Sequence, residues 1–258
     1  ANTDIKREGL APQHVANTYP EWIVEAENKL FINPGIPEAR QHIIDGIVEV
    51  VTQYDIDGVH LDDYFYPPHA DFPDDAAYSS YNPEDMDRAS WRRSNINDFV
   101  EQLGLAIKEV KPQVEFGISP FGVWRNFDVD PTGSDTRASV STYDHMYADV
   151  RTWIQRGWLD YVMPQIYWSM SLEAARYDKL VDWWVQEVDG TNVDLYIGHA
   201  PYKIGTKESG WHTAQEIINQ LEYNKQYSQI KGSVFFSAKD LRRDPLGIIE
   251  LLSEYYSQ

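Results

Sequence analysis

The chain has 258 residues, of which 42% are hydrophobic, so it is long enough for one large domain or two small ones. Its 41 Asp and Glu residues outnumber its 22 Lys and Arg residues, and the resulting net charge of −19 excludes nucleic acid as an expected partner and favours a neutral substrate. It contains no cysteine for disulfide or thiolate chemistry, and it lacks an apolar run long enough to span a membrane.

Helical and strand-like hydrophobic patterns alternate along the chain. A short apolar run at 29–33 leads into the first predicted helix, although it is also a possible additional strand. We predict helices over 38–54, 90–112, 144–156, 172–188, 213–228 and 246–256. We predict strands over 57–62, 114–119, 160–167, 193–198 and 232–237. This alternation predicts an α/β fold with a parallel sheet, formed by a single domain over residues 1–258.

The loops that follow the predicted strands are rich in polar and aromatic residues, whereas the loops that follow the helices are short. Sites in parallel α/β folds lie at the carboxyl ends of the strands, so the sequence concentrates its chemistry on one face. Aromatic rings stack on the apolar faces of sugars while polar groups bind the hydroxyls. The aromatic loop residues are Tyr64, Phe65, Tyr66, Trp124, Tyr167, Trp168, Tyr202 and Trp211.

The stretch DGVHLDDY at 57–64 places two adjacent carboxylates at the end of a strand. Alternation predicts that His60, Asp62 and Tyr64 share one face, which in a barrel is the interior near its mouth. Asp62 is therefore the best catalytic candidate, as nucleophile, general acid or electrostatic stabiliser. Asp63 either joins it in catalysis or caps the loop through backbone N–H groups.

Several long segments resemble the glycosyl hydrolase-like 10 family, a family of bacterial proteins related to peptidoglycan-cleaving glycosidases. The matching segments are PEWI, FINPGIPEARQHIIDGIVEVVTQYDIDGVHLDDYFYP, FGISPFGVWRN, DYVMPQIYW and VFFSAKDL, which cover nearly the whole chain. The resemblance implies a (β/α)8 barrel of the TIM type, an extracytoplasmic bacterial location, whether periplasmic, lipoprotein or secreted, and hydrolysis of a glycan such as peptidoglycan. By this resemblance the cleft contains Asp62, Asp63, Arg125, Asn126, Gln165, Tyr167 and Trp168.

A weaker resemblance connects the same stretch to chitinase-type glycosidases, whose motif is D-G-x-D-x-D-x-E. Here Asp57, Gly58 and Asp62 match that frame, whereas His60 and Tyr64 replace an aspartate and the acid glutamate. The substitution by Tyr64 means that the proton donor must come from elsewhere.

The chain departs from the glycosyl hydrolase-like family in its number of strands. Three strands that precede the PEWI segment in the family are not recognisable, so we expect an incomplete barrel with about five parallel strands, the C-terminal five βα units. An open sheet exposes two edges, and we expect them to be covered by self-association or by a missing N-terminal barrel segment.

Other polar residues have two interpretations each. Arg125 and Asn126, after Trp124, either bind a lactyl or peptide carboxylate or serve the loop, with Arg125 ion-paired to Asp128 or Asp130. His199 either bonds a sugar hydroxyl or packs within its loop.

A metal site is the weakest of the candidate sites. His60, Asp62 and Asp63, with His199 and Asp240, are conceivable metal ligands, but no second histidine lies nearby in the sequence. We therefore expect neither a metal nor another cofactor.

Taken together, these features predict a glycoside hydrolase of bacterial cell-wall or related amino-sugar polysaccharides, acting by carboxylate acid/base chemistry on a polysaccharide or oligosaccharide. Two alternatives remain: a non-catalytic carbohydrate-binding barrel, and a metal-dependent hydrolase that uses the HLDD motif at 60–63. Release of reducing ends from a glycan distinguishes the enzyme from the binding protein, and sensitivity to a chelator identifies the metal-dependent enzyme.

Overall fold

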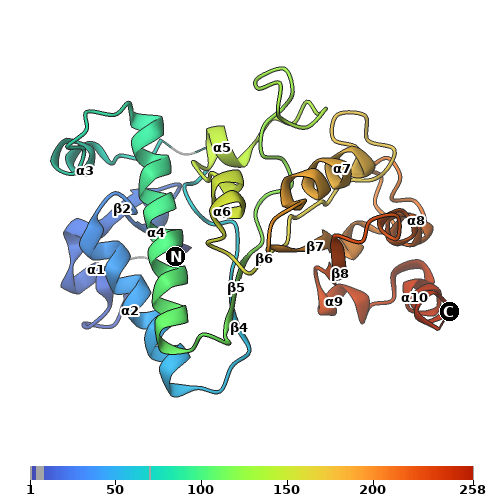
Figure 1. Ribbon diagram of the computed structural model, residues 1–258, viewed down its shortest axis with the longest axis horizontal. Helices are drawn as coiled ribbons and strands as arrows, with labels where there is room; N and C mark the ends of the chain where they lie inside the picture. The colour runs from blue at the N-terminus through green and yellow to red at the C-terminus, as the bar shows by residue number, and fades with distance from the viewer. Residues whose placement is uncertain (1, 4–8, 70, 258) are drawn as a thin grey trace. The chain divides into compact units, whose positions relative to one another are not determined.

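The computed structural model describes residues 2–3, 9–69 and 71–257, which fall into two compact units (Figure 1). The first unit comprises the described residues within Ala1–Val59, Tyr64–Glu115 and Tyr143–Trp153. The second comprises those within His60–Asp63, Phe116–Thr142 and Ile154–Gln258. The single-domain organisation stays a prediction.

The first unit contains a three-stranded antiparallel sheet in the order β1-β3-β2. Strands β2 (Ile23–Ala26) and β3 (Lys29–Ile32) form a hairpin, and β3 also pairs with β1 (Asn2–Thr3). The hairpin turn is made by Glu27 and Asn28, both with positive φ, as a tight turn between twisted strands requires. The prediction that 29–33 merely leads into a helix is therefore wrong, because this run pairs as a strand outside the parallel sheet.

Two long helices, α2 (Pro37–Gln53) and α4 (Arg88–Val110), run side by side in the first unit (Figure 1). Asp87 caps α4 by accepting a hydrogen bond from the Ser90 backbone N–H, which satisfies one of the free donors at the helix start. The two helices match the predicted ranges 38–54 and 90–112 closely. Shorter helical segments are α1 (Val15–Thr18), η2 (Pro20–Trp22), α3 (Asp75–Ser80), α5 (Thr142–His145) and α6 (Val150–Arg156).

The prediction of one continuous helix over 144–156 is wrong. The chain forms α5 and α6 instead, and Tyr147 between them has a φ of 54°. A left-handed residue cannot continue a right-handed helix, so the helical pattern is interrupted at this point.

The parallel sheet has five strands in the order β4-β5-β6-β7-β8. Their bounds are β4 (Gly58–Leu61), β5 (Glu115–Ile118), β6 (Tyr161–Val162), β7 (Asp194–His199) and β8 (Ile230–Phe235). The second unit holds the carboxyl ends of β4 and β5 together with the three later strands. The strand order follows the chain order, as in a (β/α) barrel, and the described residues add no further strand to this sheet. The fold is thus α/β, with the five strands of an incomplete barrel that the sequence predicts.

Strand β6 is much shorter than the predicted strand over 160–167. Pro164 has no N–H to donate, so regular pairing stops after Val162. Pairing resumes at Gln165, which forms isolated bridges with Phe121 on one side and Gly198 on the other. The interruption nevertheless keeps Gln165 between the ends of its neighbouring strands.

The helices of the second unit pack around β7 and against one another. Helix α7 (Tyr177–Val188) contacts β7 and α8 (Gln215–Asn224), and α8 contacts α10 (Ile248–Tyr256) (Figure 1). Helix α7 begins later than the predicted 172, because its N-cap is Arg176. The remaining segments are η3 (Pro201–Lys203), α9 (Ala238–Leu241) and η4 (Pro245–Gly247).

Candidate active site

The end of β4 places His60 and Asp62 on the same face of the sheet, as strand alternation predicts. His60 Nε2 lies 3.0 Å from Ser119 Oγ, and its Nδ1 lies 3.0 Å from the Tyr161 hydroxyl. The Ser119 hydroxyl in turn donates to Asp62 Oδ1 at 3.2 Å. Three neighbouring strands therefore contribute to one polar cluster that ends on the Asp62 carboxylate.

The direction of these hydrogen bonds follows from the chemistry of Asp62. An ionised carboxylate only accepts, so the Ser119 hydroxyl donates to it and must itself accept from His60 Nε2–H. A neutral His60 then accepts from the Tyr161 hydroxyl through Nδ1. Burial lowers the pKa of His60, an effect that the charge of Asp62 opposes, and the lowered pKa is consistent with the neutral ring.

Next to this cluster, two tyrosine rings on neighbouring strands are flanked by glycines on the outer strands. The Tyr161 ring lies against Gly117, where an added Cβ would come within 2.2 Å of the ring. Tyr161 also makes an edge contact with Tyr196, and Gly232 leaves room for the Tyr196 ring in the same way. Inward-pointing residues of a barrel form such layers, and here the missing side chains of the glycines accommodate the large rings of their neighbours.

Gln165 fixes the orientation of Asp62 from the next strand. Its Nε2 donates to Asp62 Oδ1 at 2.9 Å and to the Ser119 carbonyl at 3.0 Å. Its backbone N–H donates to the Pro120 carbonyl at 2.9 Å, which anchors the residue beyond the interruption at Pro164. Ser119 and Gln165 thus both donate to one oxygen of Asp62, which fixes the orientation of its carboxylate.

Asp63 is in a different environment, although it is the adjacent residue. Burial first, and the negative charge of Asp62 second, together raise the pKa of its carboxyl to about 6. Its backbone N–H donates to Asp62 Oδ1 at 3.1 Å, so the two residues are tied together. The pair thus combines a held carboxylate with a carboxyl that retains its proton up to mildly acidic pH, the combination that acid-assisted glycoside cleavage uses.

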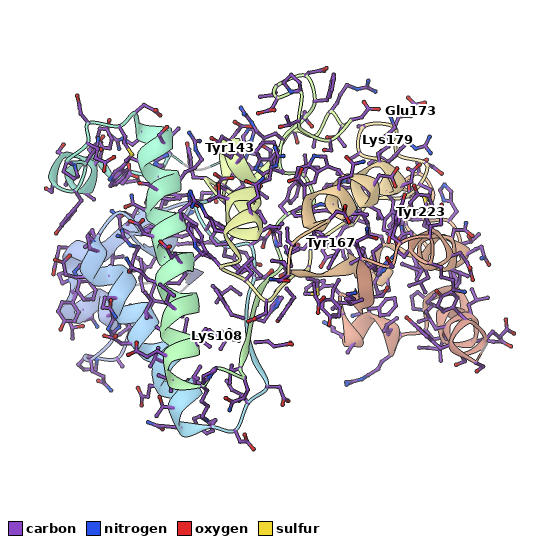
Figure 2. All side chains as sticks on the ribbon, viewed as in Figure 1. Lys108, Tyr143, Tyr167, Glu173, Lys179 and Tyr223 are labelled. Carbon is purple, nitrogen blue, oxygen red and sulfur yellow. The ribbon has the colours of Figure 1, made fainter. Side chains whose placement is uncertain are left out.

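Aromatic side chains continue the site beyond Gln165. Tyr167, labelled in Figure 2, has a pKa that is raised first by burial and then by the charge of Asp62. Its ring contacts Tyr202 edge-on at 6.0 Å and stacks near Phe236 at 6.2 Å. Trp168 meets Phe121 edge-on at 5.2 Å. Gln165, Tyr167, Trp168 and Tyr202 line one pocket of about 510 Å³.

Three predicted binding residues of the long loop make contacts within that loop or against helix α7. Arg125 pairs with Asp130 at 3.0 Å, the second of its two interpretations. The Asn126 side chain bonds the backbone of Ala138 through both its oxygen and its nitrogen. Trp124 is buried and stacks on Trp183 at 5.8 Å. The structure does not bring these residues to the Asp62 cluster.

Strand β4 ends at Leu61, so its alternation does not extend to Tyr64, which belongs to the first unit and is 70% exposed.

His199 does not join the Asp62 cluster, because residues of α8 and β8 hold both of its ring nitrogens. His199 is fully buried, with Nδ1 2.9 Å from Gln220 Oε1 of α8 and Nε2 3.1 Å from Ser233 Oγ. It alternates with Leu195 and Ile197, which are also fully buried, so its side chain faces the helix layer. Burial lowers the pKa of His199 to about 4, against the opposing effect of the Gln220 hydrogen bond, so the ring is neutral. His199 is thus a packed histidine, the other interpretation open to it.

Sequence reasoning missed Ser119 and Tyr161 as members of the cluster. Ser119 follows Gly117 by two residues and so shares the inner face at the end of β5, which is the one signal that indicates it. Tyr161 lies at the start of β6, where no signal except strand parity indicates the interior.

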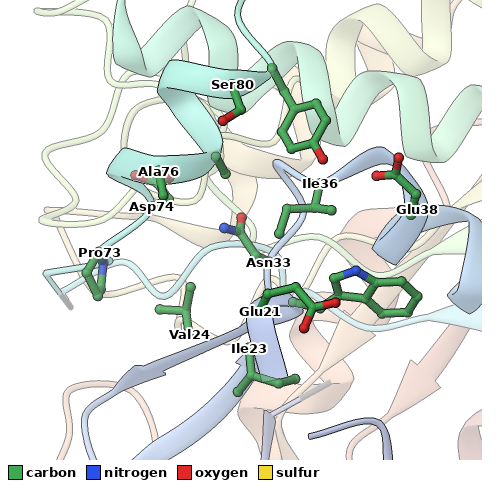
Figure 3. A pocket seen from close by; sticks show the side chains of 13 residues that line it. Glu21, Ile23, Val24, Asn33, Ile36, Glu38, Pro73, Asp74, Ala76 and Ser80 are labelled. Atoms are coloured by element: carbon green, nitrogen blue, oxygen red, sulfur yellow. The ribbon is translucent and has the colours of Figure 1, made fainter. Parts of the chain in front are cut away.

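The first unit has a pocket of its own, of about 470 Å³, which is shown in Figure 3. Its most buried acid is Asp74, whose carboxylate accepts hydrogen bonds from both Arg88 and Arg92. Because two guanidinium groups already neutralise this carboxylate, it is not available as an acid or a base. The catalytic candidates therefore remain those of the second unit.

Residues 2–3, 9–69 and 71–257 contain neither a metal-binding cluster nor a helix suited to span a membrane. Within these residues, no three or more His, Asp or Glu side chains gather in a way that could hold a metal ion. None of the helices there is both long and apolar enough to cross a membrane.

A parallel incomplete barrel with an acidic pair at the carboxyl end of one strand is an arrangement suited to glycosidases. The chain belongs to the glycosyl hydrolase-like 10 family, whose model matches residues 7–213. The resemblance that the sequence motifs indicate is thereby confirmed.

Named relatives of the chain are bacterial. The glycosyl hydrolase YngK of Bacillus subtilis (strain 168) is 49% identical over 263 residues, which cover 100% of this chain and 51% of the relative. The glycosyl hydrolase DigH of Escherichia coli (strain K12) is 42% identical over 233 residues, which cover 87% of this chain and 53% of the relative. The chain thus spans about half the length of the curated relatives that it matches.

Among solved structures, bee venom hyaluronidase matches with a TM-score of 0.37 and 13% sequence identity, over 86% of this chain and 63% of that chain. A TM-score this low supports no further assignment.

Proposed function

We propose that the chain carries the catalytic carboxylates of a glycosidase that hydrolyses bacterial cell-wall or related amino-sugar polysaccharides. The observation that supports this proposal best is the unequal pair at the end of β4. Asp62 accepts hydrogen bonds from Ser119 and Gln165, while burial and the charge of Asp62 raise the pKa of Asp63 to about 6.

The pair suggests a division of roles. Asp62, held by two donors, stabilises positive charge on the sugar ring in the transition state or attacks its anomeric carbon. Asp63, when protonated, gives its proton to the leaving-group oxygen. The rings of Tyr167 and Trp168 supply apolar faces for neighbouring sugar units, and Gln165 keeps the Asp62 carboxylate in a fixed orientation.

The proposed substrate and location are supported by the family and the relatives of the chain. YngK and DigH are both named glycosyl hydrolases and both come from bacteria. Together with membership of the glycosyl hydrolase-like 10 family, these names support a glycan substrate. An extracytoplasmic location, as a periplasmic protein, a lipoprotein or a secreted protein, would bring the chain to the cell wall.

The decisive experiment replaces Asp62 by Asn and measures reducing ends released from purified bacterial glycan strands. We expect activity to fall by about 10³-fold or more, because the transition state loses its charge stabilisation. Far-ultraviolet circular dichroism and the affinity for the glycan should stay near those of the parent.

The matched control is Asp189→Asn, which changes an exposed acid and keeps the oxygen that accepts from Gln229. This control should retain full activity. Hydrolysis by Asp62→Asn within tenfold of the parent would remove Asp62 from the mechanism, and loss of parental activity in a chelator would favour the metal-dependent alternative. A parent that binds glycan but releases no reducing ends would favour the carbohydrate-binding alternative.

A further inference from the structure

The pocket next to Gln165 carries a local charge opposite to that of the chain. Its lining includes the cations Arg137 and Lys203 and contains no Asp or Glu. In the whole chain, acids outnumber bases by 41 to 22. The full lining is Phe121, Arg137, Ala138, Ser139, Val140, Gln165, Tyr167, Trp168, Leu172, Ala174, Ala175, Tyr202 and Lys203. A cationic pocket in so acidic a chain is suited to an anionic group.

Arg137 presents an accessible guanidinium on a fixed backbone. Its N–H donates to the Ala174 carbonyl at 2.7 Å, which holds the main chain at the pocket wall. The side chain is exposed, and within the described residues it forms no ion pair. The Asp135 carboxylate is hydrogen-bonded and ion-paired to Lys179, which lowers its pKa. The charge of Arg137 makes a smaller contribution to the same lowering. Arg137 is therefore free to bind an incoming anion.

Lys203 places a second positive charge on the same lining. Its Nζ lies 2.7 Å from Glu208 Oε2, so part of its charge is compensated. The Lys203 side chain is only 14% exposed, whereas that of Glu208 is 54% exposed. The counter-ion is therefore the more solvated partner, and its attraction is weakened by solvent.

The pocket adjoins the catalytic candidates through Gln165. This residue lines the pocket and also donates to Asp62, while the neighbouring Tyr167 has a pKa raised first by burial and then by the charge of Asp62. A sugar bound against Tyr167, Trp168 and Tyr202 would thus lie beside the acidic pair, separated from it by the Gln165 amide.

We propose that this pocket is a subsite for a sugar unit that bears a carboxylate, with Arg137 as its main recognition residue and Lys203 as an auxiliary charge. A guanidinium binds a carboxylate through two parallel hydrogen bonds, and the aromatic rings pack against the sugar ring. This inference rests on the proposed glycosidase function. The carboxylate is either the lactyl ether of an acidic amino sugar or the ring carboxylate of a uronic acid. Local charge thus overrides the preference for a neutral substrate that the net charge suggests.

The test measures binding apart from hydrolysis, by titration calorimetry at low salt with the Asp62→Asn protein. Three oligosaccharides of equal length are compared: a neutral N-acetylglucosamine oligomer, an oligomer with lactyl carboxylates and one with uronic acid units. Arg137→Gln should weaken binding of the acidic oligomer that the pocket recognises by tenfold or more, and change binding of the neutral oligomer less than twofold. The oligomer affected identifies the source of the carboxylate. Arg242→Gln, a change at another exposed arginine, should alter neither affinity.

Carboxyl reduction provides the complementary measurement. Converting the carboxylates of the acidic oligomer to alcohols should weaken its binding to the Asp62→Asn protein by the same factor. The additional substitution Arg137→Gln should then cause no further loss of affinity for the reduced oligomer. Equal losses for acidic and neutral oligomers in Arg137→Gln, or unchanged affinity after reduction, would overturn the subsite. The parental protein's release of reducing ends is scored separately, so failure of the glycosidase proposal is distinguishable from failure of this one.

Discussion

Asp62 and Asp63 are adjacent in sequence, yet their surroundings differ enough to give them different chemistry. Asp62 accepts from Ser119, from Gln165 and from the backbone N–H of Asp63. The Asp63 carboxyl is instead partly buried away from solvent and lies close to the negative charge of Asp62. Because an alternating strand points successive side chains to opposite faces, the end of β4 after Leu61 is where two consecutive acids can approach one site.

The raised pKa of Asp63 predicts a pH dependence of catalysis. If Asp63 is the proton donor, kcat/KM should decline as pH rises through about 6, because the carboxyl loses the proton that it must transfer. In Asp63→Asn the activity that remains should lack this decline. The measurement is kcat/KM for a soluble glycan between pH 4 and 8.

His60 provides the control for this assignment, since it is the other titrating group in the cluster. Burial lowers its pKa from the usual value of 6.5, so its charge change lies at lower pH. His60→Gln should therefore keep the decline near pH 6. A decline that disappears in His60→Gln and persists in Asp63→Asn would assign the proton to the histidine.

At the residue scale, alternation along a strand predicts which face a site residue occupies, whereas position at a strand end alone does not. His60 and Asp62 share a face as expected, because both lie at the end of one regular strand. His199 also lies at a strand end, yet its parity with Leu195 and Ile197 turns it toward α8. The position of His199 at a strand end thus indicates the edge of the sheet on which it lies, and its parity indicates the face.

At the element scale, the inner face of the sheet depends on glycines that make room for rings. An added Cβ at Gly117 would lie 2.2 Å from the Tyr161 ring, which is hydrogen-bonded to His60. The ring must therefore shift to accept even one methyl group. Glycine in a strand is otherwise unfavourable, so this close approach gives it a physical reason.

We predict that Gly117→Ala lowers the free energy of unfolding by about 1–3 kcal/mol and disturbs the hydrogen bond between Tyr161 and His60. Gly46→Ala in α2 is the matched control, because an added Cβ there meets nothing within 4 Å. The helix propensity of alanine should make that variant more stable by up to about 1 kcal/mol. Urea unfolding followed by circular dichroism measures both changes, and equal effects of the two substitutions would contradict the packing argument.

The predictability of the elements follows from the strength of their patterns. All five parallel strands were predicted because buried apolar runs between turn signals are distinctive. The β2–β3 hairpin was missed because its strands have only four residues each and its turn uses Glu27 and Asn28 rather than glycine. The sequence does indicate why β6 ends at Val162, because Pro164 has no backbone N–H to donate to a neighbouring strand.

At the scale of the whole molecule, the open sheet is the main physical problem. Within the described residues, β4 and β8 each have a single neighbour in the parallel sheet, so each leaves backbone groups unpaired along one side. Val234 of β8 is 39% exposed and Phe236 just after it is 57% exposed. Unpaired strand edges beside exposed apolar side chains promote association with another chain.

We predict that the chain self-associates through β8 in a concentration-dependent manner. Val234→Lys should weaken this association, because a charged lysine resists burial against a second copy and is a common device for blocking edge strands.

The matched control is Ile249→Lys in α10, which places the same charge on a side chain that is 43% exposed. Sedimentation velocity over a hundredfold range of concentration should show the average mass rising for the parent and for Ile249→Lys, and rising less for Val234→Lys. A parent that stays monomeric throughout would contradict self-association, and equal weakening by both lysines would attribute it to net charge rather than to β8.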